Sequence, residues 1–249
     1  MDDLLGMRIY DLISRTDFSD NKWFVTYQNV ESVYQSGPQC GIVALCMALN
    51  NLKIKCSVDE LMKDAREQSF TKSGEIFNID FLHNLALKYY PKCSIHTMSD
   101  DDSKICEKLI ENKLILIAYD CDLNFEPCNK NGLRAHWALL TGILFPIDSN
   151  ETEYFQDFLK EDSNLILPHN DLTQAQRDIL KFNSTKKNIY AICRQGKSKH
   201  YGLWDLNRLI ESNKQLKLID HVKCNDENFV KPKDGDLQKT LAFKFLVFE

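Results

Sequence analysis

A cysteine stands where a polar turn becomes an apolar segment. Gly37-Pro-Gln-Cys-Gly41 runs directly into a nearly unbroken apolar series that ends near Leu52. The length of this series and its Ala, Leu and Met content predict a buried helix over residues 40–52. A thiol in the first turn of a helix faces unsatisfied backbone N–H groups and the positive end of the helix dipole, which favour the thiolate and lower its pKa. Cys40 is therefore a candidate nucleophile, whereas Cys46, farther along the same helix, is expected to be inert.

A cysteine nucleophile needs a histidine base and a third side chain that orients the base. His136 is favoured among the six histidines because a polar loop enters an apolar strand there, and His200, in a turn, is the second choice. Asp205 is the candidate orienting residue because it follows the strand expected beside that of His136. The alternative is that Asp205 only caps the next helix. The amides of Gln35 and Gln39 are both candidates to donate to a developing oxyanion.

The elements that position these residues follow from hydrophobic periodicity. Helices come first along the chain and strands follow, which indicates an α+β domain. Leu241, Phe243, Phe245 and Val247 alternate in the last strand, so they are expected on one face. Helices are expected over residues 40–52, over 57–65 behind a Ser57 capping box, after Asn78, and from Ser99 or Asp100. Strands are expected over residues 114–119, 136–144, 188–194 and 240–248.

Residues 147–187 differ from their surroundings. They are polar, begin with several acidic residues and interrupt the series of strands. We interpret them as an insertion, partly helical, beside the site that the strands build. The length of 249 residues otherwise suits one large domain over residues 1–249.

Composition argues against several classes of protein. A net charge of −5 argues against a nucleic-acid-binding protein, and no apolar run reaches the roughly 18 residues that a membrane span needs. The N-terminus has no secretory signal pattern, so the nine cysteines are expected to be reduced thiols in the cytoplasm. They contain no Cys-x-x-Cys pair, so neither a metal site nor a cofactor is expected.

Three motifs, taken together, resemble the actin maturation protease family. They are Gln35-Ser-Gly-Pro-Gln-Cys-Gly41, Ala135-His-Trp-Ala-Leu-Leu-Thr-Gly142 and Gln195-Gly-Lys-Ser-Lys-His-Tyr-Gly-Leu-Trp-Asp205. The resemblance runs from about Trp23 to about Leu218, apart from the polar insertion. It implies a papain-like fold, related to bacteriocin-processing peptidases, in which the nucleophile's helix packs on an antiparallel sheet. It also implies a cytoplasmic cysteine aminopeptidase that removes the acetylated first residue of immature actin.

The resemblance also implies roles for individual residues. It makes Cys40 the nucleophile, His136 the general base and Asp205 the third member of the triad. Papain-like enzymes usually place the oxyanion glutamine six residues before the cysteine. Gln35 is five residues before Cys40, so Gln35 is favoured and Gln39 stays open.

The implied substrate has an acidic N-terminus, and several cations stand near the expected site. Arg134 precedes His136, and Arg194, Lys197 and Lys199 follow the neighbouring strand. We expect these four to form a basic rim that accepts the acidic peptide; the alternative is that they are merely solvated.

The resemblance leaves the partner and the reaction with alternatives. Mammalian members have a proline-rich extension suited to binding profilin. This chain has six prolines and no such tract, which puts direct binding of profilin in doubt. Actin is the expected substrate, and profilin-bound actin stays an alternative. The alternative functions are those of a papain-like transpeptidase and of a catalytically inert module that binds actin or another peptide.

Overall fold

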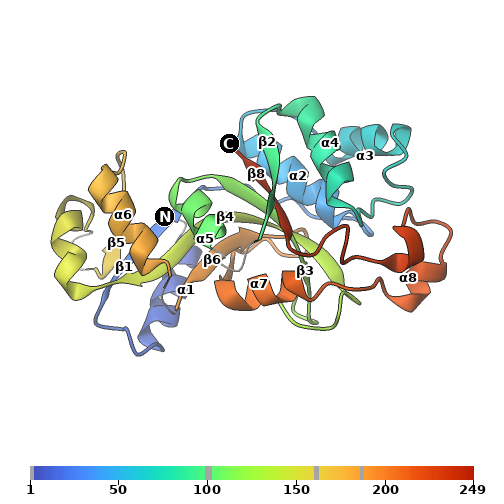
Figure 1. Cartoon of the computed structure of the whole chain (residues 1–249). Coiled ribbons are helices and arrows are strands. Elements are labelled where there is room, and N and C mark those ends of the chain that lie inside the picture. The colour runs from blue at the N-terminus through green and yellow to red at the C-terminus, as the bar shows by residue number, and fades with distance from the viewer. Residues whose placement is uncertain (1–2, 99–102, 160–162, 186–187) are drawn as a thin grey trace.

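An eight-stranded sheet forms the centre of the molecule, with helices against both of its faces (Figure 1). The computed structural model describes residues 3–98, 103–159, 163–185 and 188–249. The combination of helices with a mainly antiparallel sheet confirms the α+β prediction. None of the helices in these ranges is long and apolar enough to cross a membrane.

The long strand β4 organises the sheet. It pairs with β3 through residues 135–140, with β1 through residues 142–147 and with β6 through residues 139–144, always antiparallel. The order is β2-β8-β3-β4-β1-β5, and β7 continues the sheet beyond β6; only β1 and β5 are parallel. The strands are β1 (Lys22–Tyr27), β2 (Cys93–Thr97), β3 (Leu114–Asp120), β4 (Ala135–Ile147), β5 (Leu165–Ile166), β6 (Tyr190–Arg194), β7 (Gly202–Asp205) and β8 (Lys244–Phe248).

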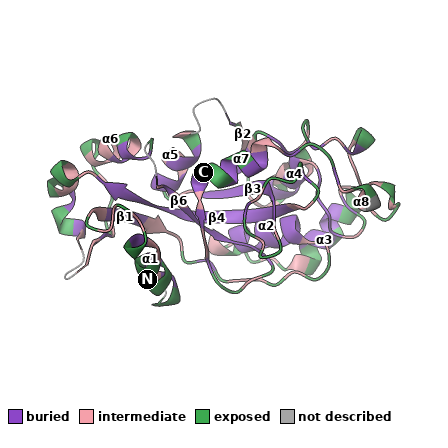
Figure 2. Ribbon diagram, turned by 90° about the horizontal axis from the view of Figure 1, so that it is seen from below, coloured by how far each residue is buried: buried purple, intermediate pink, exposed green. Residues whose placement is uncertain are grey.

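Helices bury both faces of the sheet, as the purple strands of Figure 2 show. Leu116 and Leu246 pack into a cluster with α2, α3 and α4, whereas their neighbours Ile117 and Phe245 pack on the other face with α5, α6 and α7. The helices are α1 (Asp3–Ser14), α2 (Cys40–Asn51), α3 (Val58–Glu67), α4 (Ile79–Tyr89), α5 (Ser103–Ile110), α6 (Gln174–Asn183), α7 (Leu206–Lys214) and α8 (His221–Asn225), with 3-10 helices η1 (Ser149–Phe158) and η2 (Lys233–Gly235). Burial on both sides explains why these strands are continuously apolar in sequence.

The N-terminal helices follow the predicted signals. α2 begins at Cys40, and every residue from there to Leu49 is buried, which confirms the buried helix. Ser57 and Glu60 form the predicted capping box of α3. Asn78 caps α4 by accepting a hydrogen bond from a backbone N–H of the first turn. The predicted start of the next helix at Ser99 or Asp100 lies outside the described residues.

The last strand begins later than predicted. β8 starts at Lys244, because Phe243 has a left-handed backbone with φ of 60° and interrupts the extended chain. Phe243 is 38% exposed, so it does not share a buried face with Phe245 and Val247. The expectation that the alternation begins at Leu241 is therefore wrong.

The segment 147–187 is built into the core. η1, β5 and α6 contribute buried apolar side chains, among them Phe155, Ile166 and Leu180. β5 also extends the sheet by pairing with β1. The segment is partly helical, as expected, but its polar composition conceals an apolar inner face.

Candidate active site

Cys40 is the first residue of α2, at the position that the sequence predicted. Its thiol is buried, and the backbone N–H groups of Gly41 and Trp137 point toward it. Burial raises the pKa of the Cys40 thiol, and those N–H groups, with the charge of Lys223, act in the opposite direction. The lowering expected from the start of a helix is thus present, but desolvation outweighs it. The resting side chain is therefore a thiol.

A glycine allows α2 to sit directly on β4. A Cβ atom at Gly41 would lie 3.0 Å from Cδ1 of Trp137 and 3.4 Å from Cβ of Ile76. The Trp137 indole is fixed in turn, because its Nε1–H donates to the Ile76 carbonyl at 2.9 Å. Gly41 therefore sets how closely the nucleophile approaches the strand that carries His136.

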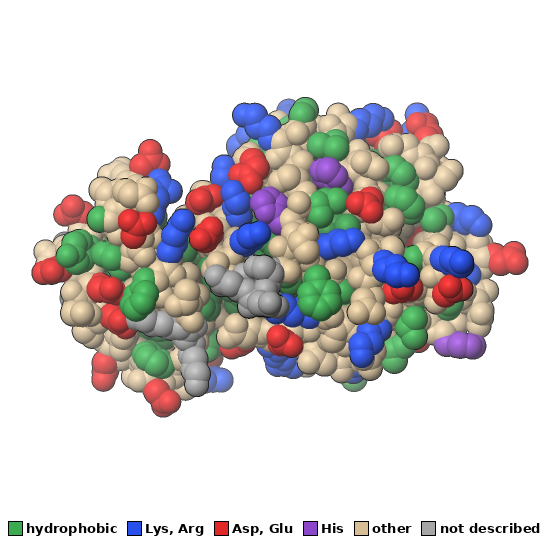
Figure 3. Space-filling view, viewed as in Figure 1, with side chains coloured by type: hydrophobic (Ala, Val, Ile, Leu, Met, Phe, Trp, Pro, Cys, Tyr) green, Lys and Arg blue, Asp and Glu red, His purple; other side chains and the backbone are tan. Residues whose placement is uncertain are grey.

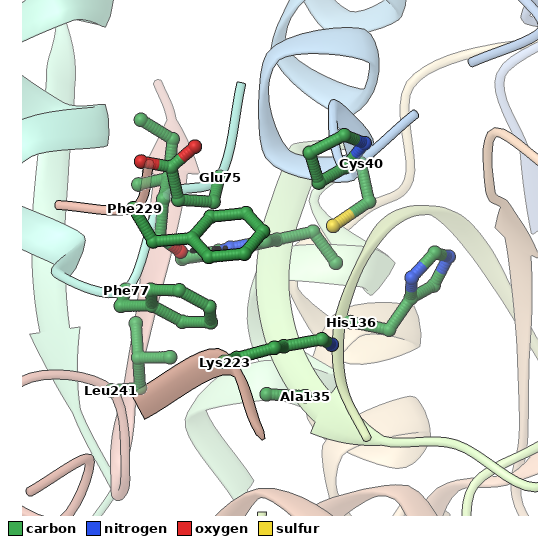
Figure 4. A pocket seen from close by; sticks show the side chains of 11 residues that line it. Cys40, Glu75, Phe77, Ala135, His136, Lys223, Phe229 and Leu241 are labelled. Atoms are coloured by element: carbon green, nitrogen blue, oxygen red, sulfur yellow. Dashed lines mark hydrogen bonds between the residues drawn. The ribbon is translucent and has the colours of Figure 1, made fainter. Parts of the chain in front are cut away.

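His136 is the second residue of β4 and lies 6% exposed among aromatic rings. Its ring centroid is 5.7 Å from that of Tyr119 and 5.4 Å from that of Phe125. Burial lowers the pKa of His136 to about 4. At neutral pH the imidazole is uncharged and can accept a proton. The Cys40 sulfur and the His136 ring face each other across one pocket (Figure 4).

A buried carboxylate holds the loop that leads into His136. Asp120, at the end of β3, accepts hydrogen bonds from the backbone N–H groups of Lys130, Gly132 and Arg134 at 2.6, 3.0 and 2.9 Å. The loop between β3 and β4 is thereby closed onto the strand end. The backbone that carries His136 is fixed from both sides.

Gln195, which the sequence analysis did not select, is the side chain that interacts with the His136 ring. It is 7% exposed and directly follows β6, the antiparallel neighbour of β4. Its interaction with the ring raises the pKa of His136, against the larger effect of burial. The Gln195 Oε1 atom also accepts a hydrogen bond from the Lys197 backbone at 2.6 Å. Gln195 is therefore the residue placed to orient the imidazole.

Asp205 lies too far from His136 to orient it. In the register of the sheet Asp205 pairs with Tyr190, and Tyr190 pairs with Leu144, eight positions along β4 from His136. At about 3.3 Å per residue this is a separation of roughly 26 Å along the strand. Asp205 instead caps α7 by accepting the Arg208 N–H at 2.8 Å. The structure therefore agrees with the alternative interpretation, in which Asp205 is a helix cap.

The two glutamines of the first motif differ in their surroundings. The Gln35 backbone N–H donates to the Gly196 carbonyl at 2.9 Å, and the Gln35 side chain packs against Gly196, next to Gln195. The Gln35 Oε1 atom is buried without a hydrogen-bond partner. Gln39 packs instead against Gly74. Gln35 is thus the glutamine that contacts the turn after β6, next to Gln195.

The four predicted cations do not form one accessible rim. Arg134 and Lys197 lie close enough to His136 for their charges to lower its pKa, and Lys197 is exposed. Lys199 is exposed but lines a separate small pocket. Arg194 is only 6% exposed: its Nε–H donates to the Val30 carbonyl at 3.0 Å and its guanidinium lies 3.4 Å from the Tyr201 ring centre. Arg194 is a structural residue.

The pocket that contains Cys40 and His136 is completed by residues from distant loops (Figure 4). Lys223 of α8 brings a positive charge into it, and Glu75 a carboxylate. No sequence pattern pointed to either residue, because Glu75 lies in a loop and Lys223 in the short helix α8, and neither segment has a recognisable motif. The walls are apolar and are formed mainly by Pro38, Ile76, Phe77, Trp137, Phe229 and Leu241.

The described residues offer no site for a metal ion. Nowhere among them do three His, Cys, Asp or Glu side chains converge in a way that could hold one. The second-choice base His200 is exposed and lines the small pocket of Lys199, away from Cys40.

Comparison with known proteins adds independent information. Residues 30–144, which include Cys40 and His136, match the family model "Actin maturation protease-like, C-terminal domain". An actin maturation protease of Danio rerio is 32% identical over 236 residues, which are 92% of this chain and 75% of the relative. One of Drosophila melanogaster is 32% identical over 213 residues, 84% of this chain and 64% of the relative. A Bacillus anthracis structure described as a C39-like peptidase superposes at a TM-score of 0.44 with 11% identity, covering 89% of this chain and 95% of that one.

Proposed function

The chain belongs to the actin maturation protease family, and from this we propose that it is a cysteine aminopeptidase that removes the acetylated first residue of immature actin. The observation that carries the proposal is that Cys40, at the start of α2, and His136, at the start of β4, share one pocket. A thiol with an imidazole base across the same pocket is the pair that nucleophilic catalysis by cysteine uses.

Acylation starts from the neutral pair. His136 accepts the thiol proton of Cys40 as the sulfur attacks the carbonyl carbon of the acetylated residue. The Cys40 N–H and the Gln35 amide are our candidates to bind the oxyanion of the tetrahedral intermediate. Protonated His136 then donates its proton to the leaving amine, and the C–N bond breaks to give a thioester. Gln195 holds the imidazole in place throughout.

Deacylation reverses the roles. A water molecule attacks the thioester carbonyl while His136 accepts one of its protons. The C–S bond breaks, the proton returns to the Cys40 sulfur, and the acetylated amino acid leaves as a free acid. The products are one acetylated residue and actin with a new free N-terminus.

We propose that Arg134 and Lys197 accept acidic residues of the departing chain. Both charges act on His136, which must reach the leaving amine, so the chain after the scissile bond passes near them. In this proposal the enzyme works in the cytoplasm, on actin alone or bound to profilin.

The test is mass spectrometry of an acetylated actin N-terminal peptide incubated with enzyme in H₂¹⁸O. Wild type is expected to release one acetylated residue that carries ¹⁸O, and Cys40→Ala is expected to release none. Cys46→Ala is the matched control, because burial raises the pKa of Cys46 to about 12 and its thiol lies deeper in α2.

Three other outcomes have definite meanings. Intact peptide after incubation with folded wild type contradicts the protease proposal, and binding without turnover identifies a peptide-binding module. Transfer of the acyl group to an added amine in place of water identifies a transpeptidase.

A further inference from the structure

Lys223 brings an unneutralised cation to the reacting groups. Its side chain extends toward the gap between Cys40 and His136 (Figure 4), and its charge lowers the pKa of both. Among the described residues, Lys223 forms no ion pair with a carboxylate. Charges of both signs are spread over the face seen in Figure 3.

The carboxylate in the same pocket is already engaged. Glu75 is 2% exposed, and its oxygens accept hydrogen bonds from the backbone N–H groups of Lys72, Ser73 and Val230 at 3.2, 2.9 and 2.7 Å. Those bonds join the loop before α4 to the segment that carries Phe229. Glu75 therefore holds the wall of the pocket together, and Lys223 is the charged pocket residue that acts on both Cys40 and His136.

The apolar part of the pocket is on the side of Cys40 away from His136. In Figure 4, Phe77, Phe229 and Leu241 line that side. His136 must donate a proton to the leaving amine, so the departing chain lies beside His136. The residue that becomes the acyl group, together with whatever is attached to its α-nitrogen, then lies on the apolar side.

We infer that Lys223 restricts the pocket to peptides whose N-terminus is blocked. The inference rests on the proposed function and names the residue that sets its specificity. A free α-amino group has a pKa near 8, so at pH 7 it carries a positive charge, which Lys223 repels, whereas the oxygens of the pocket carboxylate, Glu75, already accept hydrogen bonds from three backbone N–H groups. An acetylated nitrogen is neutral, and its carbonyl oxygen can accept a hydrogen bond from the ammonium. Exclusion of the wrong ligand by like charge is an established route to specificity.

The first test measures charge selection at Cys40 without any peptidase activity. Methanethiosulfonates react with a thiolate to give a mixed disulfide and release methanesulfinate. Each reaction rate is measured by mass spectrometry of the peptide that contains Cys40. The rate with the anionic sulfonatoethyl reagent is then divided by the rate with the cationic trimethylammonioethyl reagent. Because both reagents attack the same thiolate, the ratio cancels any change in the pKa of Cys40.

The expected result is a ratio that depends on Lys223. Lys223→Met is expected to lower the ratio about tenfold at low salt, and Lys223→Glu further. Lys217→Glu, an equal charge change at an exposed position outside the pocket, is the control and is expected to stay within about twofold of wild type. A ratio that is the same in wild type and Lys223→Met overturns the inference.

The second test uses peptides of one sequence with an acetylated or a free N-terminus. Wild type is expected to favour the acetylated peptide in kcat/KM by about a hundredfold, and Lys223→Met is expected to lose most of that preference by gaining activity on the free peptide. A preference that survives in Lys223→Met overturns the inference. The inference is also overturned if the effect of Lys223→Met on kcat/KM depends only on the acidity of the second residue. Lys223 would then recognise a carboxylate and not the blocked N-terminus. If wild type cleaves neither peptide, the proposed function fails, and the reagent ratio alone decides the role of Lys223.

Discussion

Burial decides the resting charges of the two reacting residues. It raises the pKa of Cys40 and lowers that of His136 to about 4, so at pH 7 the pair is a thiol and a neutral imidazole. A charged pair forms only when the proton moves during attack. In the proposed mechanism the nucleophile therefore stays protonated until the carbonyl carbon is in position.

The lowered pKa of His136 makes stability depend on pH. In the unfolded chain a histidine binds a proton near pH 6.5, whereas folded His136 does so only near pH 4. The contribution of neutral His136 to the free energy of unfolding is fully present above pH 6.5. It is lost as the pH falls toward 4, because in that range only the unfolded state gains the proton.

Between pH 7 and pH 5 the free energy of unfolding is expected to fall by about 2 kcal/mol more in wild type than in His136→Phe. The phenylalanine keeps an aromatic ring beside Tyr119 and Phe125 but does not titrate. Urea unfolding of both proteins at the two pH values measures the difference. Equal losses in the two proteins would show that the pKa of His136 is the same in the folded and unfolded states.

Single residues were predictable where a local pattern contained the chemistry. Cys40 stands at a turn-to-helix boundary and His136 at a loop-to-strand boundary, and both are visible in sequence. Gln195 is brought to His136 by the register of β6 on β4, and Lys223 reaches the pocket through the packing of α8. Neither leaves a local pattern in the sequence. Gln195 was nevertheless within reach, because the end of one antiparallel strand lies beside the start of its neighbour.

At the scale of elements, the contact between α2 and β4 determines how the site is assembled. The two elements meet where Gly41 faces Trp137, so any added atom there acts on the distance between nucleophile and base. Asp120 fixes the start of the same strand through the backbone of the preceding loop. Both anchors therefore act on the end of β4 that carries His136.

Gly41→Ala is expected to lower kcat/KM by at least about tenfold while costing only about 1–2 kcal/mol in stability. The added methyl group lies 3.0 Å from Cδ1 of Trp137, so the start of α2 must move away from β4. Peptide hydrolysis and urea unfolding measure the two effects.

Ile210→Val, a buried change on α7, is the comparison for Gly41→Ala. It is expected to cost about 1 kcal/mol and to leave the kinetics unchanged. If the two variants lose activity equally, Gly41 matters only through stability.

Elements were predicted well when their signals were local. The capping box at Ser57 and the cap at Asn78 gave the starts of α3 and α4. The boundary of β8 was missed because the left-handed backbone at Phe243 is set by tertiary packing and not by the residue type. The strand β1 is an aromatic-rich run whose pairing with β4, more than 110 residues later, no local pattern could indicate.

At the scale of the whole molecule, we expect the segment between β4 and β6 to unfold together with the sheet. Phe155 of η1 is fully buried, and its ring lies 6.5 Å from that of Phe24 in β1. Among the described residues of this segment, none lines the Cys40 pocket. We therefore expect the segment to affect stability more than chemistry.

Phe155→Ala is therefore expected to destabilise the protein by about 3–5 kcal/mol while unfolding stays a single transition. Loss of this core residue affects the sheet that carries His136, so circular dichroism and loss of activity are expected to coincide on heating. Tyr154→Ala, at the exposed neighbouring position, is the control and is expected to stay within about 0.5 kcal/mol of wild type. Two separate transitions in Phe155→Ala would mean that residues 147–187 fold independently.

The position of β8 has a consequence for the chain while it folds. β8 lies between β2 and β3, and Leu114 of β3 pairs with Phe248, more than half the chain away. Closing so long a loop is slow, and until it closes β2 and the helices around it have no fixed place on the sheet. The strand order thus predicts that β2 joins the sheet late in folding.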